Sequence, residues 1–341
     1  MRYIATIMLL AVSLSLAAQK VKLVGDEAKN KVDVLIDGKL VTSYCYPANI
    51  EKPFLFPICA PNGTVVTRGF PLEPRKGERV DHPHHIGLWF NHGNINGLDF
   101  WNNSSAIPAN RKNEYGHIVV RKIVKAESGR TGTLEVAADW DDNSGNVLLT
   151  EKAVYKFNTG KNAWWVDHIS TLTAANGDVT ITDNKEGMFA LRVDRAFEMP
   201  TKEALIFTDE KGNPTTVKAT DNTGVTGMYK SSNGKEGDAV WGTRNEWVIL
   251  SGTKDNTPVS MAIFDNPKNP GFPAYAHARG YGLFSVNNLG QKSYDPKQEQ
   301  VVYKLAKGQS ITLVHRFYIQ SGSELTGEGA VKIFEDFKKA Y

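Results

Sequence analysis

The sequence has no cysteine pattern on which a fold or a metal site could be built. Its two cysteines are Cys45 and Cys59, and no CxxC or paired Cys/His spacing of the zinc type is present. In an oxidising compartment the two thiols could pair, and two separate thiols are an equal alternative. Two cysteines do not make a disulfide scaffold, so a disulfide-rich small fold is excluded.

Motifs for nucleotide chemistry and for serine hydrolases are also missing. The chain contains no GxSxG, no GxGxxG that opens a helix and no GxxxxGK[ST]. Hydride transfer on a Rossmann domain and phosphoryl transfer on a P-loop therefore have no support. The net charge of +3 is small, and no run of Lys and Arg is longer than a pair. These features argue against a nucleic-acid partner.

Long apolar runs are confined to the N-terminus. Arg2 precedes an apolar segment over residues 4–16, and Ala17 and Ala18 follow it. This order is typical of a secretory signal peptide, and the segment is shorter than the roughly 20 residues of a membrane span. No later segment is apolar enough to cross a bilayer. We therefore expect residues 1–18 to be a signal peptide, and the mature protein to be soluble and periplasmic or secreted.

The rest of the chain is dominated by strand patterns. Asp37-Gly38 is a strong hairpin dipeptide. Segment 47–80 is predicted to be a loop with short extended pieces, and segment 209–245 a long irregular loop. One amphipathic helix is predicted at the end, with Ala330, Phe334, Phe337 and Tyr341 on its apolar face and Glu328, Lys332, Asp336 and Lys339 on its wet side. The predicted strands cover residues 32–36, 40–44, 117–124, 132–140, 147–157, 163–172, 178–183, 187–193, 203–208, 246–251, 259–264, 282–286, 300–305 and 311–319.

About 15 strands without repeats or a linker predict one domain over residues 19–341. Strands of this length and spacing fit a large antiparallel sheet better than a small barrel. We therefore predict an all-β fold, a two-sheet sandwich with a C-terminal helix.

The stretch 81–101 is the strongest candidate for a site, because it holds four of the chain's eight histidines. Pro83 biases His82 toward an extended backbone, so His82 and His84 would point to one face about 6–7 Å apart, and His85 to the other. Three readings remain open. The pair could ligate a metal together with His92, Asp99 or His277. The histidines could hydrogen-bond within a crowded loop. They could also act as acid, base or substrate donors in a metal-free pocket.

Other residues could complete the site. Trp89 and Trp101 could form a sugar-stacking platform or pack in the core. Glu186 could be a catalytic carboxylate, with Lys185 or Arg192 binding an anionic group. His277 and Arg279 share one face if their segment is extended, which would build a composite site from distant parts of the chain. For His168 a surface position is predicted, and for His315 an interior one.

Several motifs together resemble a bacterial family that is often labelled "methane oxygenase PmoA" or DUF6807. They are the residues 66–71, 81–85, 97–101, 185–187, 265–270 and 277–283. The resemblance implies an exported β-rich protein with a galactose-mutarotase-like supersandwich. Methane oxidation is not carried over, because this chain has no predicted membrane span. Ile86 stands where family members often have a basic residue, which puts an anion contact at that position in doubt.

Taken together, the sequence predicts an exported carbohydrate-active protein. The preferred reading is an acid/base enzyme acting on a sugar or glycoside, of the epimerase, lyase or hydrolase type. The alternatives are a non-catalytic glycan-binding protein and a metal-dependent enzyme with His82 and His84 as ligands. No cofactor is expected, although a divalent metal is the third alternative. The expected catalytic residues are His82, His84, Glu186 and His277, and the expected substrate-binding residues are Arg68, Asp81, His85, Trp89, His92, Asp99, Arg279 and Tyr281.

Overall fold

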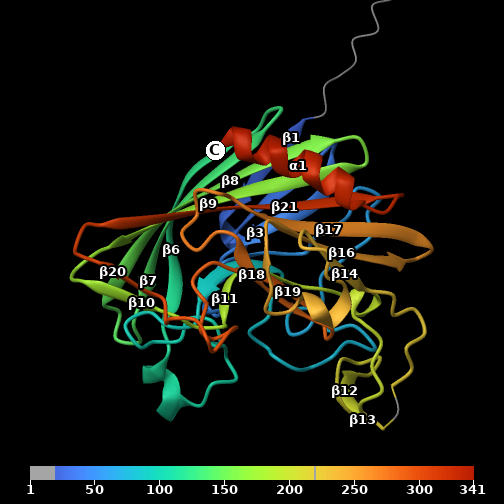
Figure 1. Cartoon of the computed structure of the whole chain (residues 1–341), viewed down its shortest axis with the longest axis horizontal. Helices are drawn as coiled ribbons and strands as arrows, with labels where there is room; N and C mark the ends of the chain where they lie inside the picture. The colour runs from blue at the N-terminus through green and yellow to red at the C-terminus, as the bar shows by residue number, and fades with distance from the viewer. Residues whose placement is uncertain (1–19, 219) are drawn as a thin grey trace, which may run out of the picture.

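The computed structural model describes residues 20–218 and 220–341. The predicted signal peptide, residues 1–18, lies outside the described residues. Two large antiparallel sheets account for most of the described chain (Figure 1). The predicted all-β fold with a C-terminal helix is therefore confirmed.

The first sheet has nine strands, in the order β1 (Val21–Asp26), β2 (Lys31–Ile36), β3 (Lys39–Cys45), β4 (Phe54–Leu55), β5 (Leu88–His92), β11 (Gly187–Arg192), β19 (Leu283–Asn287), β18 (Ala274–Arg279) and β15 (Arg244–Asn245). The second has eight, in the order β14 (Met228–Ser231), β16 (Trp247–Lys254), β17 (Thr257–Asp265), β21 (Ser310–Ser321), β9 (Ala163–Ala174), β8 (Val147–Gly160), β7 (Gly132–Asp141) and β6 (His117–Glu127). Two small sheets pair β10 (Val179–Thr182) with β20 (Val302–Leu305) and β12 (Leu205–Thr208) with β13 (Pro214–Val217). The helical segments are η1 (Glu27–Lys29), η2 (Ala109–Glu114), η3 (Arg195–Phe197), η4 (Gly237–Val240) and α1 (Gly327–Ala340).

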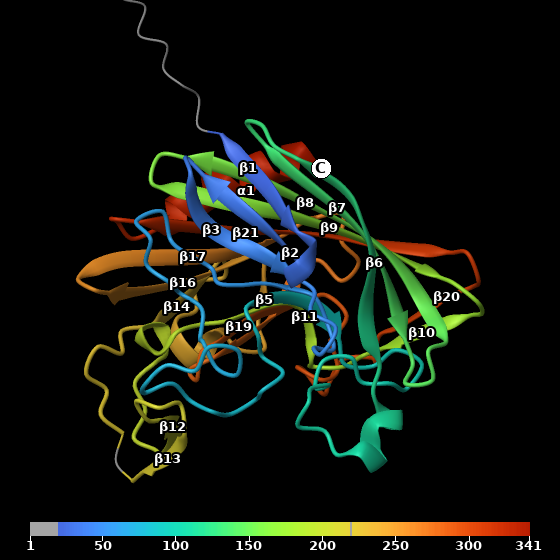
Figure 2. The ribbon, with the colours of Figure 1, turned by 180° about the vertical axis from the view of Figure 1, so that it is seen from behind.

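The inner faces of the two large sheets pack against each other and form the main core. Phe90 of β5 and Phe189 of β11 come from the nine-stranded sheet. The Phe90 ring centroid lies 6.1 Å from that of Trp140 in β7 and 5.0 Å from that of His168 in β9, and Phe189 stacks on His168 at 5.4 Å. Figure 2 shows the same two layers from behind. Because side chains alternate along a strand, each sheet also has an outer face.

Most of the long predicted strands are present, and the predicted hairpin joins β2 to β3. Asp37 and Gly38 both have positive φ, 49° and 78°, as a type I′ turn requires. Strand β4 agrees with the short extended pieces predicted for 47–80, whereas the prediction of an irregular loop over 209–245 is wrong in part, because that segment contains β13, β14 and β15. These strands are two to four residues long, which is too short to produce a recognisable period in the sequence.

Helix α1 covers the outer face of the eight-stranded sheet, as Figure 1 shows. It begins after Thr326, whose hydroxyl accepts a hydrogen bond from the Gly329 N–H at 3.1 Å. Phe334 and Phe337 are buried against a cluster that includes Trp247 and Phe264. The predicted apolar and wet sides of this helix are confirmed.

Truncation of Phe334 to alanine is expected to destabilise the protein by about 3–5 kcal/mol, because it opens a cavity under α1. Phe334 is 2% exposed. The measurement is the free energy of unfolding in urea. Val331→Ala on the exposed side of the same helix is the control and should change stability by less than about 0.5 kcal/mol. Equal effects of the two variants would show that α1 contributes little to the core.

Two sequence predictions concern single buried residues. His168, predicted on a surface, is fully buried, so that prediction is wrong, whereas His315 is buried as predicted. Cys45 and Cys59 carry free thiols, and burial raises the pKa of Cys45 to about 11.

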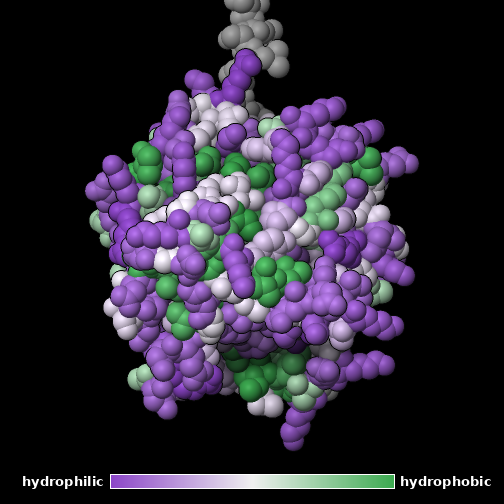
Figure 3. Space-filling model, turned by 60° about the vertical axis from the view of Figure 1, so that its left-hand side comes forward, coloured by the Kyte–Doolittle hydropathy of each residue, from purple (hydrophilic) through white to green (hydrophobic). Residues whose placement is uncertain are grey.

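The surface gives no sign of a large apolar interface on the side shown in Figure 3, where hydrophobic residues form small separate patches between hydrophilic ones. Single exposed residues such as Val124 and Val302 are ordinary in a globular protein. Within the described ranges, no helix combines the length and the apolar character needed to cross a membrane.

Candidate functional site

The outer face of the nine-stranded sheet carries most of the residues that the sequence analysis singled out. Along β18 the alanines at 274, 276 and 278 face the core, so His277 and Arg279 face outward. On the neighbouring strands the same alternation turns Trp89 and Arg192 outward. The shared face of His277 and Arg279 is therefore present in the structure.

The segment before β5 forms a tight turn. His82 has a φ of 44°, in the left-handed region, and the His85 N–H donates to the His82 carbonyl at 3.0 Å. Pro83 therefore takes the second position of a turn, where its fixed φ is favourable. The prediction of an extended segment with His82 and His84 on one strand face is wrong. Their ring centroids nevertheless lie 5.6 Å apart, because the turn brings them together.

Arg68 explains why the turn takes this form. Its guanidinium donates to the backbone carbonyls of Arg79, Asp81, His82 and His85 at 2.8–3.2 Å and to Asp81 Oδ1 at 2.7 Å. The Arg68 side chain is 1% exposed. Both Nη groups therefore form hydrogen bonds within the protein. Arg68, an expected substrate-binding residue, stabilises the turn and has no Nη group left for a ligand.

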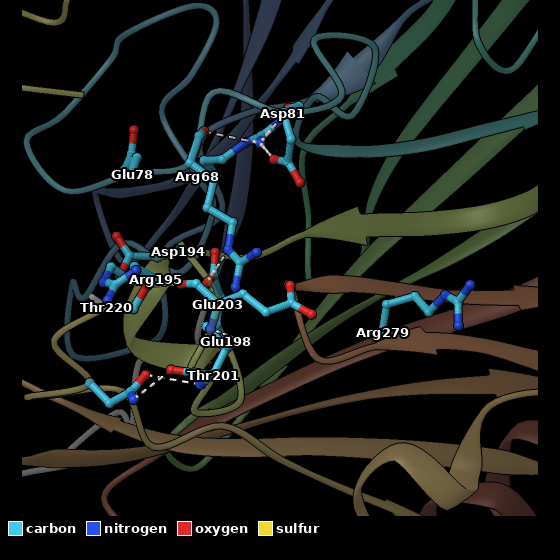
Figure 4. A network of polar contacts seen from close by, with 12 residues as sticks. Arg68, Glu78, Asp81, Asp194, Arg195, Glu198, Thr201, Glu203, Thr220 and Arg279 are labelled. Atoms are coloured by element: carbon cyan, nitrogen blue, oxygen red, sulfur yellow. Dashed lines mark hydrogen bonds and ion pairs between the residues drawn. The ribbon is translucent and has the colours of Figure 1, made fainter. Parts of the chain in front are cut away.

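A second buried arginine, Arg192 at the end of β11, also forms an ion pair with Asp81. Arg192 Nη2 donates to Asp81 Oδ1 at 2.6 Å, and Arg192 Nη1 lies 3.2 Å from His85 Nδ1. Figure 4 shows the contact between Arg68 and Asp81. Arg192 is fully buried. It therefore does not offer the surface anion contact considered for it.

Asp81 is a fixed anion that orients His82. Its Oδ2 lies 3.0 Å from His82 Nδ1. Burial opposes ionisation of Asp81, but Arg192, the hydrogen bond from His82 and Arg68 outweigh it, so the pKa of Asp81 lies well below its usual value. Because Nδ1 is held in this way, Nε2 is the His82 nitrogen left for a ligand.

Four rings stack in a column from the surface inward. Ring centroids are separated by 5.1 Å from Tyr281 to His82, 4.7 Å from His82 to His85 and 5.3 Å from His85 to Trp89. The His82 side chain is 41% exposed, whereas Trp89 and Trp101 are 1% and 0% exposed. The two tryptophans support the histidines from below and form no exposed platform, so the feature that suggested a glycan-binding module is not present.

Glu186 and His277 form the second polar part of this face. Glu186 immediately precedes β11, and its Oε2 lies 3.9 Å from His277 Nδ1 while its Oε1 lies 2.9 Å from Lys185 Nζ. The Trp101 ring lies 5.7 Å from His85 and 6.3 Å from His277. Trp101 therefore joins the two parts, and the composite arrangement of distant segments is present.

Burial keeps the inner histidines neutral. Desolvation lowers the pKa of His84 to about 2 and that of His277 to about 3, with further contributions from Lys52 and Arg279 respectively. The pKa of His85 is also lowered well below its ordinary value by burial. A neutral imidazole has one donor and one acceptor nitrogen, so these rings suit hydrogen bonding to hydroxyl groups and not proton donation.

Lys52 belongs to the site, although the sequence analysis did not identify it. Its ammonium donates to the His84 carbonyl at 2.7 Å and to the Trp101 carbonyl at 3.4 Å, and lies 5.3 Å from the centre of the Trp89 ring. Burial lowers its pKa to about 7. Lys52 connects both ends of the 81–101 stretch. A single lysine in a proline-containing loop carries no signal that could have revealed this.

Two expected site residues are not brought into the cluster. His92 belongs to β5, is 1% exposed, and its Nε2 lies 2.8 Å from the Thr182 carbonyl. Asp99 Oδ1 accepts hydrogen bonds from the Trp101 and Asn102 N–H groups at 2.8 and 2.9 Å, so it stabilises a turn.

The metal alternative for His82 and His84 needs further ligands. In the part of the chain that the structure describes, no group of three or more His, Cys, Asp and Glu side chains is placed to hold a metal ion. His92 and Asp99, two of the ligands considered, are occupied elsewhere.

A cavity adjoins the site at Asp81. It has a volume of about 390 Å³ and is lined by Arg79, Val80, Asp81, Ala204, Leu205, Ile206 and Thr216. The last four come from the region of the β12–β13 hairpin. Asp81 is the residue that the cavity shares with the cluster.

The profile of one protein family, described as a family of unknown function (DUF6807), matches residues 31–335. The label that refers to methane oxygenase is not part of this match. A search of the curated proteins finds no match.

Solved structures similar to this chain include three with carbohydrate-related titles. The galactosidase domain of an alpha-galactosidase-sucrose kinase has a TM-score of 0.40 and 9% identity over 89% of this chain, which spans 42% of that domain. A galactose mutarotase-like protein from Clostridium acetobutylicum has a TM-score of 0.31 and 11% identity, covering 88% of this chain and 98% of that one. A galactose mutarotase related enzyme from Lactobacillus acidophilus has a TM-score of 0.28 and 9% identity, covering 89% and 97%.

Proposed function

We propose an activity from the site itself, because this chain belongs to DUF6807, a family of unknown function. The proposed activity is proton transfer on a sugar, of the isomerising or eliminating kind, in an exported enzyme. The observation that carries it is the presence of two different proton-transfer groups on one face, the Asp81–His82 pair and the carboxylate of Glu186. Tyr281 stacks on His82, and burial raises the pKa of its hydroxyl.

The two groups divide the work in this proposal. Glu186 removes a proton from the sugar, and His82 Nε2 delivers a proton to another oxygen of the same molecule. In isomerisation a proton returns to carbon and His82 takes its own proton back, so the composition of the sugar does not change. In elimination the proton removed by Glu186 comes from carbon, the bond from the neighbouring carbon to the protonated oxygen breaks, a carbon–carbon double bond forms, and the oxygen leaves with its substituent as an alcohol. The neutral rings of His84 and His277 bind hydroxyl groups.

Hydrolysis with two carboxylic acids fits the site less well. That mechanism needs one carboxyl group that is protonated and acts as an acid. Asp81 is held ionised by two arginines, and its pKa lies well below the usual value. Asp81 therefore supports His82 in this proposal and does not donate a proton itself.

Replacement of Glu186 by Gln is expected to lower kcat by about 10²–10⁴-fold, because it removes the base but keeps the shape of the side chain. Incubation of a panel of free sugars and glycans in D₂O, followed by proton NMR, detects both isomerisation and deuterium incorporation. His82→Gln should give a loss of the same order.

Matched controls come from the surface. Glu210→Gln changes a carboxylate that is 74% exposed and pairs with Lys76, and His117→Gln changes a histidine on β6. Both should retain wild-type rates. Glu186→Gln with wild-type turnover of the same sugar would refute the assignment of the base.

A further inference from the structure

Three arginines lie under or beside this face, and the protein uses them differently. The Nε atom is buried without a partner in all three, but the Nη groups of Arg68 and Arg192 contact Asp81, backbone carbonyls and His85. For the Arg279 guanidinium, by contrast, no hydrogen bond or ion pair is found among the described residues. Figure 4 shows Arg279 on a separate strand, without a dashed line to the other residues drawn.

The position of Arg279 is nevertheless well defined. Its guanidinium carbon lies 4.7 Å from the centre of the Trp241 ring, and its Nε is buried without a partner. A buried donor without a partner costs roughly 1–3 kcal/mol, and a cation stacked on an aromatic face keeps its edge free for in-plane contacts. The arginine is therefore held in place with its hydrogen-bonding fork unused.

The carboxylate of Glu186 forms no ion pair with this cation. Glu186 pairs with Lys185 at 2.9 Å. Arg279 lies on the same outer face of β18 as His277, two residues along the strand, and His277 Nδ1 is 3.9 Å from Glu186 Oε2. A ligand that reaches Glu186 thus meets an unpaired guanidinium next to it.

We infer that Arg279 binds the carboxylate of an acidic sugar, so that the ligand of this site is a glycan containing uronic acid. A planar guanidinium forms two parallel hydrogen bonds to a carboxylate, which a neutral hydroxymethyl group cannot reproduce. This inference rests on the proposed function for the site and names its substrate class. A carboxylate next to the reacting carbon also makes the adjacent proton more acidic, which suits abstraction by Glu186.

Binding can be measured apart from turnover. Calorimetric titrations would compare galacturonate, glucuronate and mannuronate oligosaccharides with the corresponding neutral oligosaccharides, using the full chain. The wild type should bind at least one acidic oligosaccharide more tightly than its neutral counterpart by about 10–100-fold, the range expected for hydrogen bonds to a charged group. Arg279→Gln should abolish that preference, and Arg279→Lys should retain part of it.

Arg130→Gln, at an exposed position, is the matched control and should keep the full preference. Glu186→Gln should also keep it, because that variant removes the base and not the carboxylate-binding group. Failure of the wild type to prefer any acidic oligosaccharide, or an unchanged preference in Arg279→Gln, would overturn the inference. Preference for sulfated glycans or inorganic phosphate over uronates would likewise refute a carboxylate ligand. In that case, the wild type could still turn over a neutral sugar, and Glu186→Gln could abolish that turnover. This result would support the proposed reaction and reject uronic acids as its substrate class.

Discussion

Asp81→Asn is expected to destabilise the protein by about 3–5 kcal/mol and to abolish its activity. Two guanidiniums, 1% and 0% exposed, share the Asp81 Oδ1 atom at 2.7 and 2.6 Å. Removal of the charge from one partner leaves the buried cations uncompensated, which is far more costly than the loss of a surface pair. The free energy of unfolding, from urea titration at neutral pH, measures the effect.

The activity loss has a separate cause that the same variant can reveal. Without the Asp81 carboxylate, His82 loses the group that holds its Nδ1, so proton delivery should fail even in the fraction that folds. Asp139→Asn is the control, because Asp139 pairs with the half-exposed Arg121 and should cost less than about 1 kcal/mol. A fully active Asp81→Asn variant of wild-type stability would contradict both the structural and the catalytic role.

Acidification from about pH 7.5 to about pH 5 is expected to destabilise the protein by several kcal/mol. The pKa values of six buried histidines are lowered by burial: those of His84, His85, His92, His168, His277 and His315. Below about pH 6.5 the unfolded chain takes up protons that the folded protein does not, at a cost of up to about 1.4 kcal/mol per pH unit for each residue. The contribution of these histidines to the free energy of unfolding is therefore fully present above about pH 6.5 and is lost as the pH falls.

Buried carboxyl groups with raised pKa values have the opposite effect on the pH dependence of stability. They are fewer than the histidines with strongly lowered pKa values. Burial raises the pKa of Asp265 to about 7 and also raises that of Glu151. These groups take up protons in the folded state first, which stabilises it on acidification. The histidines outnumber them, so the net slope should remain positive with pH. Urea titrations at several pH values measure that slope.

His168→Phe isolates one contribution to this slope. The His168 ring lies 4.7 Å from Tyr155 and 5.4 Å from Phe189, and both its nitrogens are buried without partners. Phenylalanine fits such surroundings and cannot titrate, so the variant should reduce the slope by about 1.4 kcal/mol per pH unit. An identical slope in His168→Phe and the wild type would show that His168 is protonated inside the fold.

The fold could be predicted from the sequence to the extent that it depends on local patterns. Alternation predicts the long strands of the eight-stranded sheet, and the spacing of Ala330, Phe334 and Phe337 predicts α1. The short strands β4, β13 and β15 could not be predicted in this way, because two to four residues show no period. Strand β15, for example, pairs with β18, and β16 and β17 lie between the two in the chain.

Within the candidate site, residue types were easier to predict than their roles. The choice of His82, Glu186 and His277 rested on their chemistry, and the structure places them on one face; their roles remain predictions. Arg68 and Trp89 were also chosen for their chemistry, but burial gives both a supporting position. Burial of one side chain depends on the packing of every element around it, which the sequence near that residue does not contain.

The His82 turn marks the division between sequence and tertiary structure most clearly. The sequence by itself determined that a histidine-rich segment with a fixed proline precedes a strand, because these are covalent properties of residues 81–92. Only the tertiary structure decided that the segment turns. The buried Arg68 guanidinium donates hydrogen bonds to the carbonyls of His82 and His85 and to the Asp81 carboxylate, and so brings these groups together. These charge-assisted hydrogen bonds from a buried guanidinium outweigh the local preference of His82 for an extended backbone.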